Sequence, residues 1–241
     1  MLRIQNLTKH YKGSNKGVTK LNLEIKAGDI YGFIGHNGAG KTTTIKCITG
    51  IHGFDEGEIL VDGMSVKTDT FACKQKMAYI PDNPDLYEYM TGIQYLNFIA
   101  DIFGVVAKER EEKIQKYADA FEITASLGDL ISSYSHGMKQ KLAIISALVH
   151  DPKLLILDEP FVGLDPKASV VLKDIMHQIC AKGGAIFFST HVLDVAEKLC
   201  NKVAIIKDGE LITSGEMDKI VDEGTSLESI FMEVVNDGKA D

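Results

Sequence analysis

The stretch Gly35-His36-Asn37-Gly38-Ala39-Gly40-Lys41-Thr42 decides how the rest of this 241-residue chain is interpreted. It matches the pattern G-x-x-x-x-G-K-[ST] in full, follows the apolar run Ile30–Ile34 and precedes a helical segment at Thr44–Ile51. In such a loop the glycines let successive backbone N–H groups point at phosphate oxygens. The start of the helix adds a partial positive charge. The stretch therefore predicts a nucleotide-binding loop between a buried strand and a helix.

Two side chains of this loop can act on a nucleotide directly. The Lys41 ammonium supplies a full positive charge to the β- and γ-phosphates, and the Thr42 hydroxyl can ligate Mg²⁺. The expected nucleotide contacts of the loop are Gly35, His36, Asn37, Gly38, Ala39, Gly40, Lys41, Thr42 and Thr43.

Two carboxylates follow a second apolar run. Leu154–Leu157 is typical of a strand that is buried on both faces, and Asp158 and Glu159 come directly after it. Open α/β sheets place their ligands at this end of their strands. Asp158 can hold Mg²⁺ through water, and Glu159 can polarise an attacking water as a general base. Solvated acids are common at strand ends, so the pair is informative because it accompanies the glycine-rich loop.

A histidine follows a third apolar strand. His191 comes after Ala185–Ser189, so we expect it at the same sheet edge as Asp158 and Glu159. A lone histidine is more often structural than functional, but from this edge its ring could reach the γ-phosphate or the attacking water. The candidate catalytic residues are therefore Glu159, His191 and Lys41.

The order of strands and helices predicts the fold class. Their alternation indicates an α/β fold with a mainly parallel sheet, and the first strands, around Leu2–Ile4 and Leu21–Ile25, are expected to be antiparallel. Residues 85–150 are helical in character. We expect a single domain, 1–241, in which 1–84 and 151–241 form the catalytic core lobe and 85–150 form an inserted helical lobe.

Composition and charge exclude several classes of protein. Lys and Arg number 26 and Asp and Glu 34, which gives a net charge of −8 and argues against nucleic acid as a partner. The cysteines form no C-x-x-C pair, so we expect reduced thiols in a cytosolic protein. No stretch approaches the roughly 20 apolar residues of a membrane-spanning helix. Any membrane role is therefore expected through a partner.

A further glycine follows a serine at the start of a helical segment, in Tyr134-Ser135-His136-Gly137-Met138. Ser135 fits an N-cap, and Gly137 leaves backbone N–H groups accessible, which would make an exposed anion site at a helix N-terminus. An ordinary capped helix explains the same residues equally well.

The motifs in this order resemble an ATP-binding cassette (ABC) ATPase over nearly the whole chain. They are the glycine-rich loop, the helical lobe, the signature Ser135-His136-Gly137, the acidic strand, the loop Gly163-Leu164-Asp165 and His191. The resemblance implies a P-loop NTPase core, ATP and Mg²⁺ as cofactors, and hydrolysis of ATP to ADP and phosphate. It also implies that Tyr11 stacks on adenine, although an ordinary surface tyrosine is the alternative.

The same resemblance implies an assembly. Two copies of the chain, or the chain and a paired ATPase subunit, would close head to tail around two ATP molecules. Ser135 and Gly137 of one copy would then touch the γ-phosphate held by Lys41 of the other, and Asp165 would lie across the interface. A second set of donors would complete the shell around the triphosphate and exclude water.

Two positions depart from the family pattern. The ABC signature usually reads Leu-Ser-Gly-Gly-Gln, whereas the variant here resembles the exporter-type branch with separate membrane subunits or fused halves. A Gln that contacts Mg²⁺ and the membrane subunit normally follows the strand Met77–Ile80, and the matching position is Asp82. Asp82 is a hard oxygen ligand that could bind Mg²⁺, as Thr42 and Asp158 could. A turn or N-cap aspartate is at least an equal alternative.

The segment Asp82–Tyr89 joins the two lobes and carries Leu86, Tyr87 and Tyr89. Exposed aromatic side chains beside a hinge suggest a protein contact. The resemblance implies that an integral membrane transporter subunit docks here, whereas packing of the helical lobe on the core is the alternative. The expected location is therefore peripheral, on the cytoplasmic face of the cell membrane.

Three functions remain in competition. The leading hypothesis is the ATPase subunit of a membrane transporter, most like an exporter, which works by ATP-driven dimer closure. A soluble ABC ATPase that serves cofactor assembly or another non-transport role is the alternative. A non-catalytic ATP-gated adaptor is favoured only by the altered signature and Asp82, and the retention of Lys41, Asp158 and Glu159 argues against it.

Overall fold

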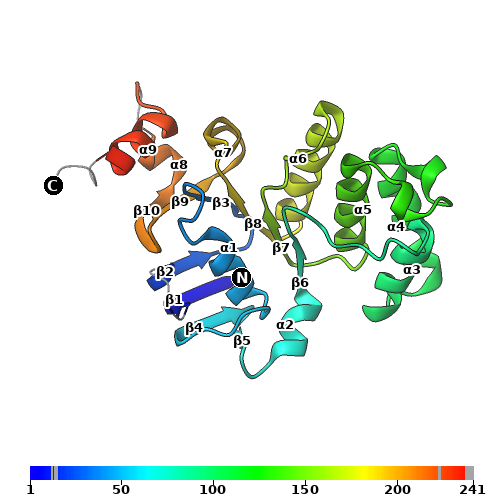
Figure 1. The fold of residues 1–241 in the computed structure, drawn as a ribbon, viewed down its shortest axis with the longest axis horizontal. Helices are drawn as coiled ribbons and strands as arrows, with labels where there is room; N and C mark the ends of the chain where they lie inside the picture. Colours follow the sequence, from blue (N-terminus) through cyan, green and yellow to red (C-terminus); the bar gives the residue numbers. More distant parts are fainter. Residues whose placement is uncertain (12, 14–15, 222–223, 237–241) are drawn as a thin grey trace.

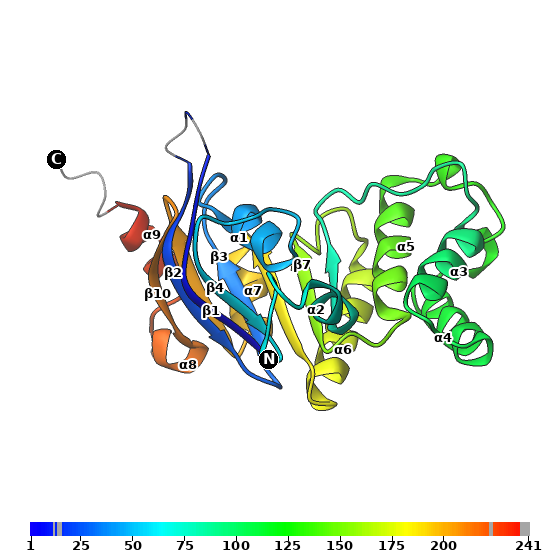
Figure 2. The ribbon, with the colours of Figure 1, turned by 90° about the horizontal axis from the view of Figure 1, so that it is seen from below.

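The computed structural model describes residues 1–11, 13, 16–221 and 224–236. In this part of the chain two sheets lie at one end of the molecule and a group of helices lies at the other (Figures 1 and 2). The first sheet has the order β2-β1-β4-β5 and is antiparallel throughout. Its strands are β1 (Leu2–His10), β2 (Gly17–Ile25), β4 (Glu56–Val61) and β5 (Met64–Ser65).

The second sheet has the order β10-β9-β3-β8-β7-β6. Its strands are β3 (Ile30–Ile34), β6 (Met77–Ile80), β7 (Leu154–Asp158), β8 (Ala185–Thr190), β9 (Lys202–Lys207) and β10 (Glu210–Glu216). Neighbouring strands pair in parallel except β10, which runs antiparallel to β9. The α/β fold with a mainly parallel sheet and antiparallel N-terminal strands is confirmed.

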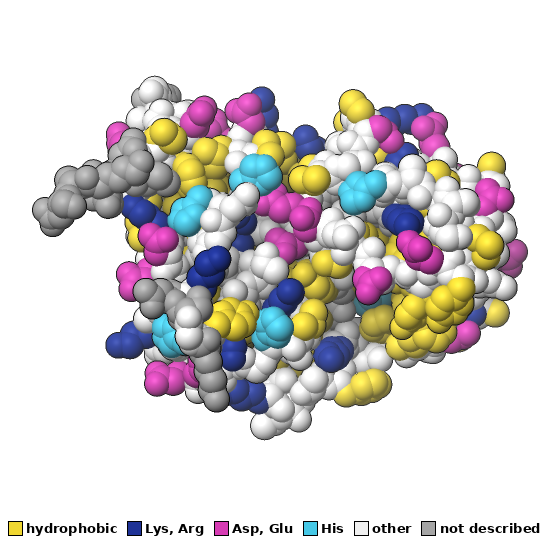
Figure 3. Space-filling model, in the orientation of Figure 1, with side chains coloured by type: hydrophobic (Ala, Val, Ile, Leu, Met, Phe, Trp, Pro, Cys, Tyr) yellow, Lys and Arg dark blue, Asp and Glu magenta, His cyan; other side chains and the backbone are white. Residues whose placement is uncertain are grey.

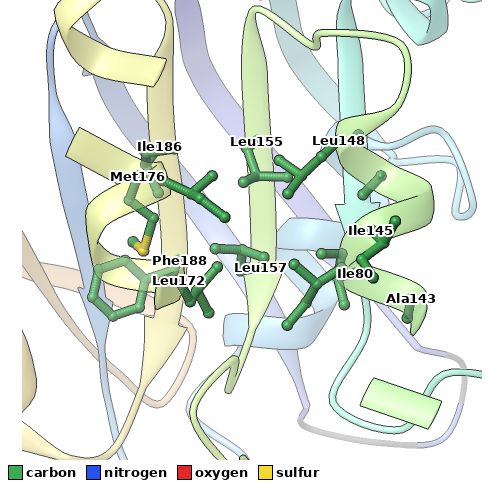
Figure 4. Packing of buried hydrophobic residues seen from close by; sticks show 14 of the residues in the cluster. Ile80, Ala143, Ile145, Leu148, Leu155, Leu157, Leu172, Met176, Ile186 and Phe188 are labelled. Atoms are coloured by element: carbon green, nitrogen blue, oxygen red, sulfur yellow. The ribbon is translucent and has the colours of Figure 1, made fainter. Parts of the chain in front are cut away.

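Both faces of the central strands are covered, which explains why their sequences are continuously apolar. In β7, Leu155 and Leu157 face a core shared with the helices, whereas Leu154 and Ile156 face a core shared with the first sheet. Figure 4 shows Leu155 and Leu157 between side chains from two helices that flank the strand. Such a doubly covered strand end is a rigid base for the side chains that follow it.

Helices of the core lie on both faces of the second sheet. They are α1 (Lys41–Ile48), α2 (Thr70–Lys76), α6 (Pro166–Ala181), α7 (Leu193–Leu199), α8 (Met217–Ile220) and α9 (Leu227–Asn236). The helix expected at Thr44–Ile51 starts earlier, because Gly40 in a left-handed conformation caps it, and ends before Gly50, which has φ +70°. The sequence analysis did not predict α2 or α7, which are single short helices with few periodic apolar residues.

A helical group occupies residues 92–148. It contains α3 (Gly92–Ile102), α4 (Ala107–Ala120) and α5 (His136–Leu148), with 3₁₀ turns at Thr124–Ser126 and Ile131–Ser133. Thr91 and Gln94 form a capping box at the start of α3, with hydrogen bonds in both directions between them. The exact division into lobes at 84/85 and 150/151 stays a prediction. None of the helices described here is long and apolar enough to cross a membrane.

Candidate nucleotide-binding site

The glycine-rich loop connects β3 to α1 and takes the conformation that its sequence allows. Gly38 has φ +88° and Gly40 has φ +109°, both in the left-handed region that side chains with a Cβ rarely adopt. Gly35 is needed for another reason, because a Cβ there would lie 2.6 Å from the Ile206 carbonyl oxygen of β9. The Gly209 N–H also donates to the Ala39 carbonyl over 2.9 Å. The loop is therefore packed tightly against β9 and the turn that follows it.

Lys41 lies inside the curve of this loop and is only 6% exposed. Its Nζ donates to the Gly35 carbonyl over 2.6 Å and to the His36 carbonyl over 3.3 Å. Burial lowers the pKa of Lys41, while the nearby Glu159 and Asp158 carboxylates oppose that effect. The ammonium is thus held where a phosphate group cradled by the loop would meet it.

Two other elements contact the Asp158 carboxylate at the end of β7. The Thr42 hydroxyl of α1 donates to Asp158 Oδ2 over 2.8 Å, and the Ser189 hydroxyl of β8 donates to Oδ1. Asp158 is 4% exposed, so these bonds fix its orientation. No group of three or more His, Cys, Asp or Glu among the described residues could hold a metal by itself. The hydroxyl and carboxylate pair fits Mg²⁺, which typically binds one or two protein oxygens and takes its other ligands from phosphates and water.

Glu159 adopts a left-handed backbone conformation, with φ +49°, which is uncommon for a residue with a side chain. Its N–H donates to the Ser189 carbonyl over 3.1 Å, and its carboxylate turns towards the end of β8. There His191 Nδ1 lies 2.9 Å from Glu159 Oε1, and the His191 N–H donates to Oε2 over 3.4 Å. Lys41 Nζ lies 3.9 Å from the same Oε1. The three candidate catalytic residues are therefore neighbours.

Lys41, Thr42, Asp158 and Glu159 line a pocket of about 340 Å³, whereas His191 lies beside Glu159 and is not part of the lining. Its lining is Tyr11, Lys16, Gly17, His36, Asn37, Gly38, Gly40, Lys41, Thr42, Thr43, Asp82, Asp158 and Glu159. Figure 3 shows acidic side chains gathered at the centre of this face, with histidines around them. The Tyr11 hydroxyl lies 3.5 Å from Thr43 Oγ1, which places the ring at the pocket wall.

Asp82 comes from the segment after β6 and lines the same pocket as Asp158 and Glu159. Burial raises the pKa of Asp82, and the charges of Asp158 and Glu159 raise it further. The structure therefore brings together the carboxylates that the sequence analysis proposed, but their mutual repulsion disfavours the ionised form of Asp82 in the absence of a cation.

Ser135, Gly137 and Asp165 are not part of the lining of this pocket. Ser135 caps α5 at an exposed position, where its hydroxyl accepts from the Met138 N–H over 3.3 Å. Asp165 caps α6 by accepting from the Ala168 N–H over 2.8 Å, and its carboxylate lies 2.6 Å from Lys141 Nζ. The Lys141 hydrogen bond lowers the pKa of Asp165.

Sequence reasoning missed Ser189 as a partner of Asp158. The two residues lie opposite each other in neighbouring parallel strands. This pairing can be predicted only if β7 and β8 are known to be adjacent. It also missed Lys16 and Gly17, which line the pocket from the start of β2. In the sequence these residues carry no motif, and the signal lies only in the sheet arrangement.

Comparison with known proteins assigns the family. The chain matches the ABC transporter family over residues 18–162. The uncharacterized ABC transporter ATP-binding protein YhcH of Bacillus subtilis is 34% identical over 92% of this chain and 72% of its own length. The linearmycin resistance ATP-binding protein LnrL of the same organism is 34% identical over 89% of this chain and 69% of its own. A solved structure of an ATP-binding subunit of an ABC transporter superposes with a TM-score of 0.92 at 32% identity, over 98% of this chain and 99% of that one. The chain belongs to the ABC transporter family, as one of its ATP-binding subunits.

Proposed function

We propose that this chain is a Mg²⁺-dependent ATPase that drives an exporter-type membrane transporter by closing as a dimer around ATP. The observation that carries the proposal is that Lys41, the Thr42–Asp158 pair and Glu159 line one pocket, and that His191 contacts Glu159. These groups come from three separate segments of the chain, and each has a distinct task in phosphoryl transfer to water.

The loop and its neighbours bind and orient the nucleotide. Backbone N–H groups of residues 38–43 receive the phosphates, and the Lys41 ammonium exchanges its contacts with loop carbonyls for β- and γ-phosphate oxygens. Thr42 and Asp158 hold Mg²⁺, which neutralises charge on the phosphate oxygens when it is bound. Asp82, which lines the same pocket, is a further candidate ligand. The Tyr11 ring stacks on the adenine at the edge of the pocket.

Glu159 and His191 act on the attacking water. The water oxygen attacks the γ-phosphorus while the Glu159 carboxylate accepts a proton from the same water. The bond between the γ-phosphorus and the oxygen that stays with ADP breaks. With its proton on Nδ1, His191 donates to Glu159 Oε1 and fixes the direction of the carboxylate. The products are ADP and phosphate, and their release reopens the site.

A second chain completes each site. Ser135 and Gly137 lie outside the pocket of their own chain at an exposed helix start, which supports their use at the γ-phosphate of a partner copy or a paired ATPase subunit. Asp165 would lie in the same interface. Extra donors of this kind stabilise charge that develops in the transition state.

The segment Asp82–Tyr89 is the proposed docking site for the membrane subunit. Tyr89 is 78% exposed, and the Tyr87 ring lies 5.7 Å from the ring of Phe98 on α3, centre to centre. Hydrophobic side chains gather on the surface at the helical end of the molecule, where α3 lies (Figures 1 and 3). Exposed apolar clusters of this kind support a protein contact. The chain would then be peripheral, on the cytoplasmic face of the membrane. The name of LnrL, a resistance protein, supports export as the direction of transport.

The test is to purify the tagged chain from detergent-solubilised membranes of its host and to identify the proteins recovered with it. A multi-spanning protein recovered in near-equal amount, together with Mg²⁺-dependent phosphate release, is expected. Recovery of soluble partners alone would favour an ATPase of cofactor assembly or another non-transport role. Absence of ATP turnover in the recovered complex would favour a non-catalytic adaptor.

A further inference from the structure

His136 stands where the family signature carries a glycine, and its ring lies against the loop that follows Glu159. A Cβ built on Gly163 would come within 2.5 Å of His136 Cδ2 and 2.7 Å of its Nε2. Gly163 also has φ +80°, a left-handed conformation that strains residues with a side chain, so a larger residue there would be both strained and close to the ring. The His136 ring thus occupies the space that the Cβ of a larger residue at position 163 would enter.

Two further contacts join the same parts of the chain. A Cβ on Gly137 would lie 2.9 Å from the Gly163 carbonyl oxygen, so the backbones approach closely there as well. Lys141, one turn further along α5, forms an ion pair of 2.6 Å with Asp165. The first turns of α5 therefore pack against residues 163–165, and the Lys141–Asp165 ion pair adds to this contact.

His136 is also close enough to Asp82, a residue of the nucleotide pocket, for their charges to interact. Although burial and two neighbouring carboxylates raise the pKa of Asp82, the charge of His136 opposes that rise. His136 itself does not line the pocket. It therefore lies against the loop at Gly163 and near Asp82, outside the pocket lining.

We propose that His136 is a positioning residue whose ring locks the signature turn onto the Gly163 loop of the same chain. This contact keeps Ser135 and Gly137 in the orientation that the nucleotide of the second chain requires. It also couples their position to that of Glu159, which acts on the nucleotide bound by the same chain. This inference rests on the proposed ATPase function and on its two-chain site. It explains why a bulky ring is present at a signature position where a glycine would serve for nucleotide contact alone.

The first test is the ATP dependence of phosphate release by the full-length chain carrying His136→Ala. Misplacement of a positioning group by about 1 Å costs up to about a hundredfold in rate. We expect kcat to fall by about ten- to a hundredfold, and KM for ATP to change by less than about twofold because His136 is outside the pocket. His177→Ala, which removes an exposed histidine on α6, should keep the parental kcat.

A double-mutant cycle tests the contact itself. Gly163→Ala places a methyl group against the His136 ring, so its effect on kcat should be at least about threefold smaller in the His136→Ala background, where the ring is gone. Additive effects within about twofold would overturn the proposed contact. If His136→Ala does not fold, as judged by its melting temperature, His136→Asn carries the same comparison.

ATP-dependent dimerisation separates a positioning role from a structural one. In the Glu159→Gln background, His136→Ala should weaken dimerisation at saturating ATP about tenfold while leaving the melting temperature unchanged. Unaltered dimerisation would overturn the inference about His136 and leave the ATPase assignment intact. A parent chain that neither hydrolyses ATP nor dimerises with it would instead overturn the proposed function.

Discussion

Replacement of the Glu159 carboxylate by an amide tests the proposed general base most directly. Gln keeps the length of the side chain and an oxygen that can accept from His191 Nδ1, which lies 2.9 Å from Glu159 Oε1. It cannot accept a proton from water at the operating pH. General base catalysis contributes about 10²–10⁴ in rate. We therefore expect Glu159→Gln to lower kcat by that factor, which corresponds to about 3–5 kcal/mol of activation free energy.

Binding of ATP should persist in the same variant. Lys41 Nζ lies 3.9 Å from Glu159 Oε1, so the carboxylate competes with the phosphate oxygens for the Lys41 ammonium. Replacing the carboxylate by a neutral amide removes this competitor. The dissociation constant for ATP should stay the same or fall, and ATP-bound dimers should accumulate. Phosphate release at saturating Mg²⁺ and ATP measures the first effect, and titration with a fluorescent ATP analogue measures the second.

Glu112→Gln provides the matched control, because it makes the same chemical change at an exposed position of α4. It should hydrolyse ATP at the parental rate. If Glu159→Gln turned over within about threefold of the parent, Glu159 could not be the base, and the reasoning from its contact with His191 would be refuted.

Three further predictions concern binding, stability and pH. Lys41→Ala removes an ammonium that the Gly35 and His36 carbonyls enclose, and the loss of its charged hydrogen bonds should weaken ATP-analogue binding by between about ten- and a hundredfold; unchanged binding would contradict its assignment. Leu157→Ala empties a fully buried position between two helices (Figure 4), so the free energy of unfolding, measured with urea, should fall by about 2–5 kcal/mol. Because the folded state raises the pKa of Asp82, its ionised form costs stability above that pKa, and the cost disappears as the pH falls through it. In the absence of metal and nucleotide, Asp82→Asn should therefore raise the melting temperature at pH 8 and much less at pH 4; an equal shift at both values would show that the effect is not electrostatic.

Features encoded in consecutive residues could be predicted from the sequence. The strand, glycine-rich loop and helix that carry Lys41 and Thr42 are continuous in the chain, and so are the capping box at Thr91–Gln94 and the Asp165 N-cap. In each case the hydrogen-bonding partners lie within a few residues of one another, so residue types and spacing are sufficient. The strand Met77–Ile80 was predicted with its observed bounds for the same reason.

Features that depend on strand order could not be predicted in this way. The bond from Ser189 to Asp158 requires β8 to lie beside β7, although 31 positions separate the two residues. The contact of His136 with Gly163 likewise requires α5 to pack near the loop before α6. Asp82 was left open by the sequence because an acid after a strand has many uses, and only the fold puts it on the pocket wall.

The burial of α5 supports the proposal that each site is shared between two chains. Ser135 is at the exposed start of this helix, whereas Leu142, Ile144, Ile145 and Leu148 further along are at most 1% exposed in the core against the sheet. Turning the helix so that Ser135 reached the chain's own Lys41 would expose these side chains, at about 1.5–3 kcal/mol each. The total is comparable with the whole stability of a domain. A second chain that brings its own Ser135 needs no such rearrangement, and the fold therefore favours a site shared between two copies.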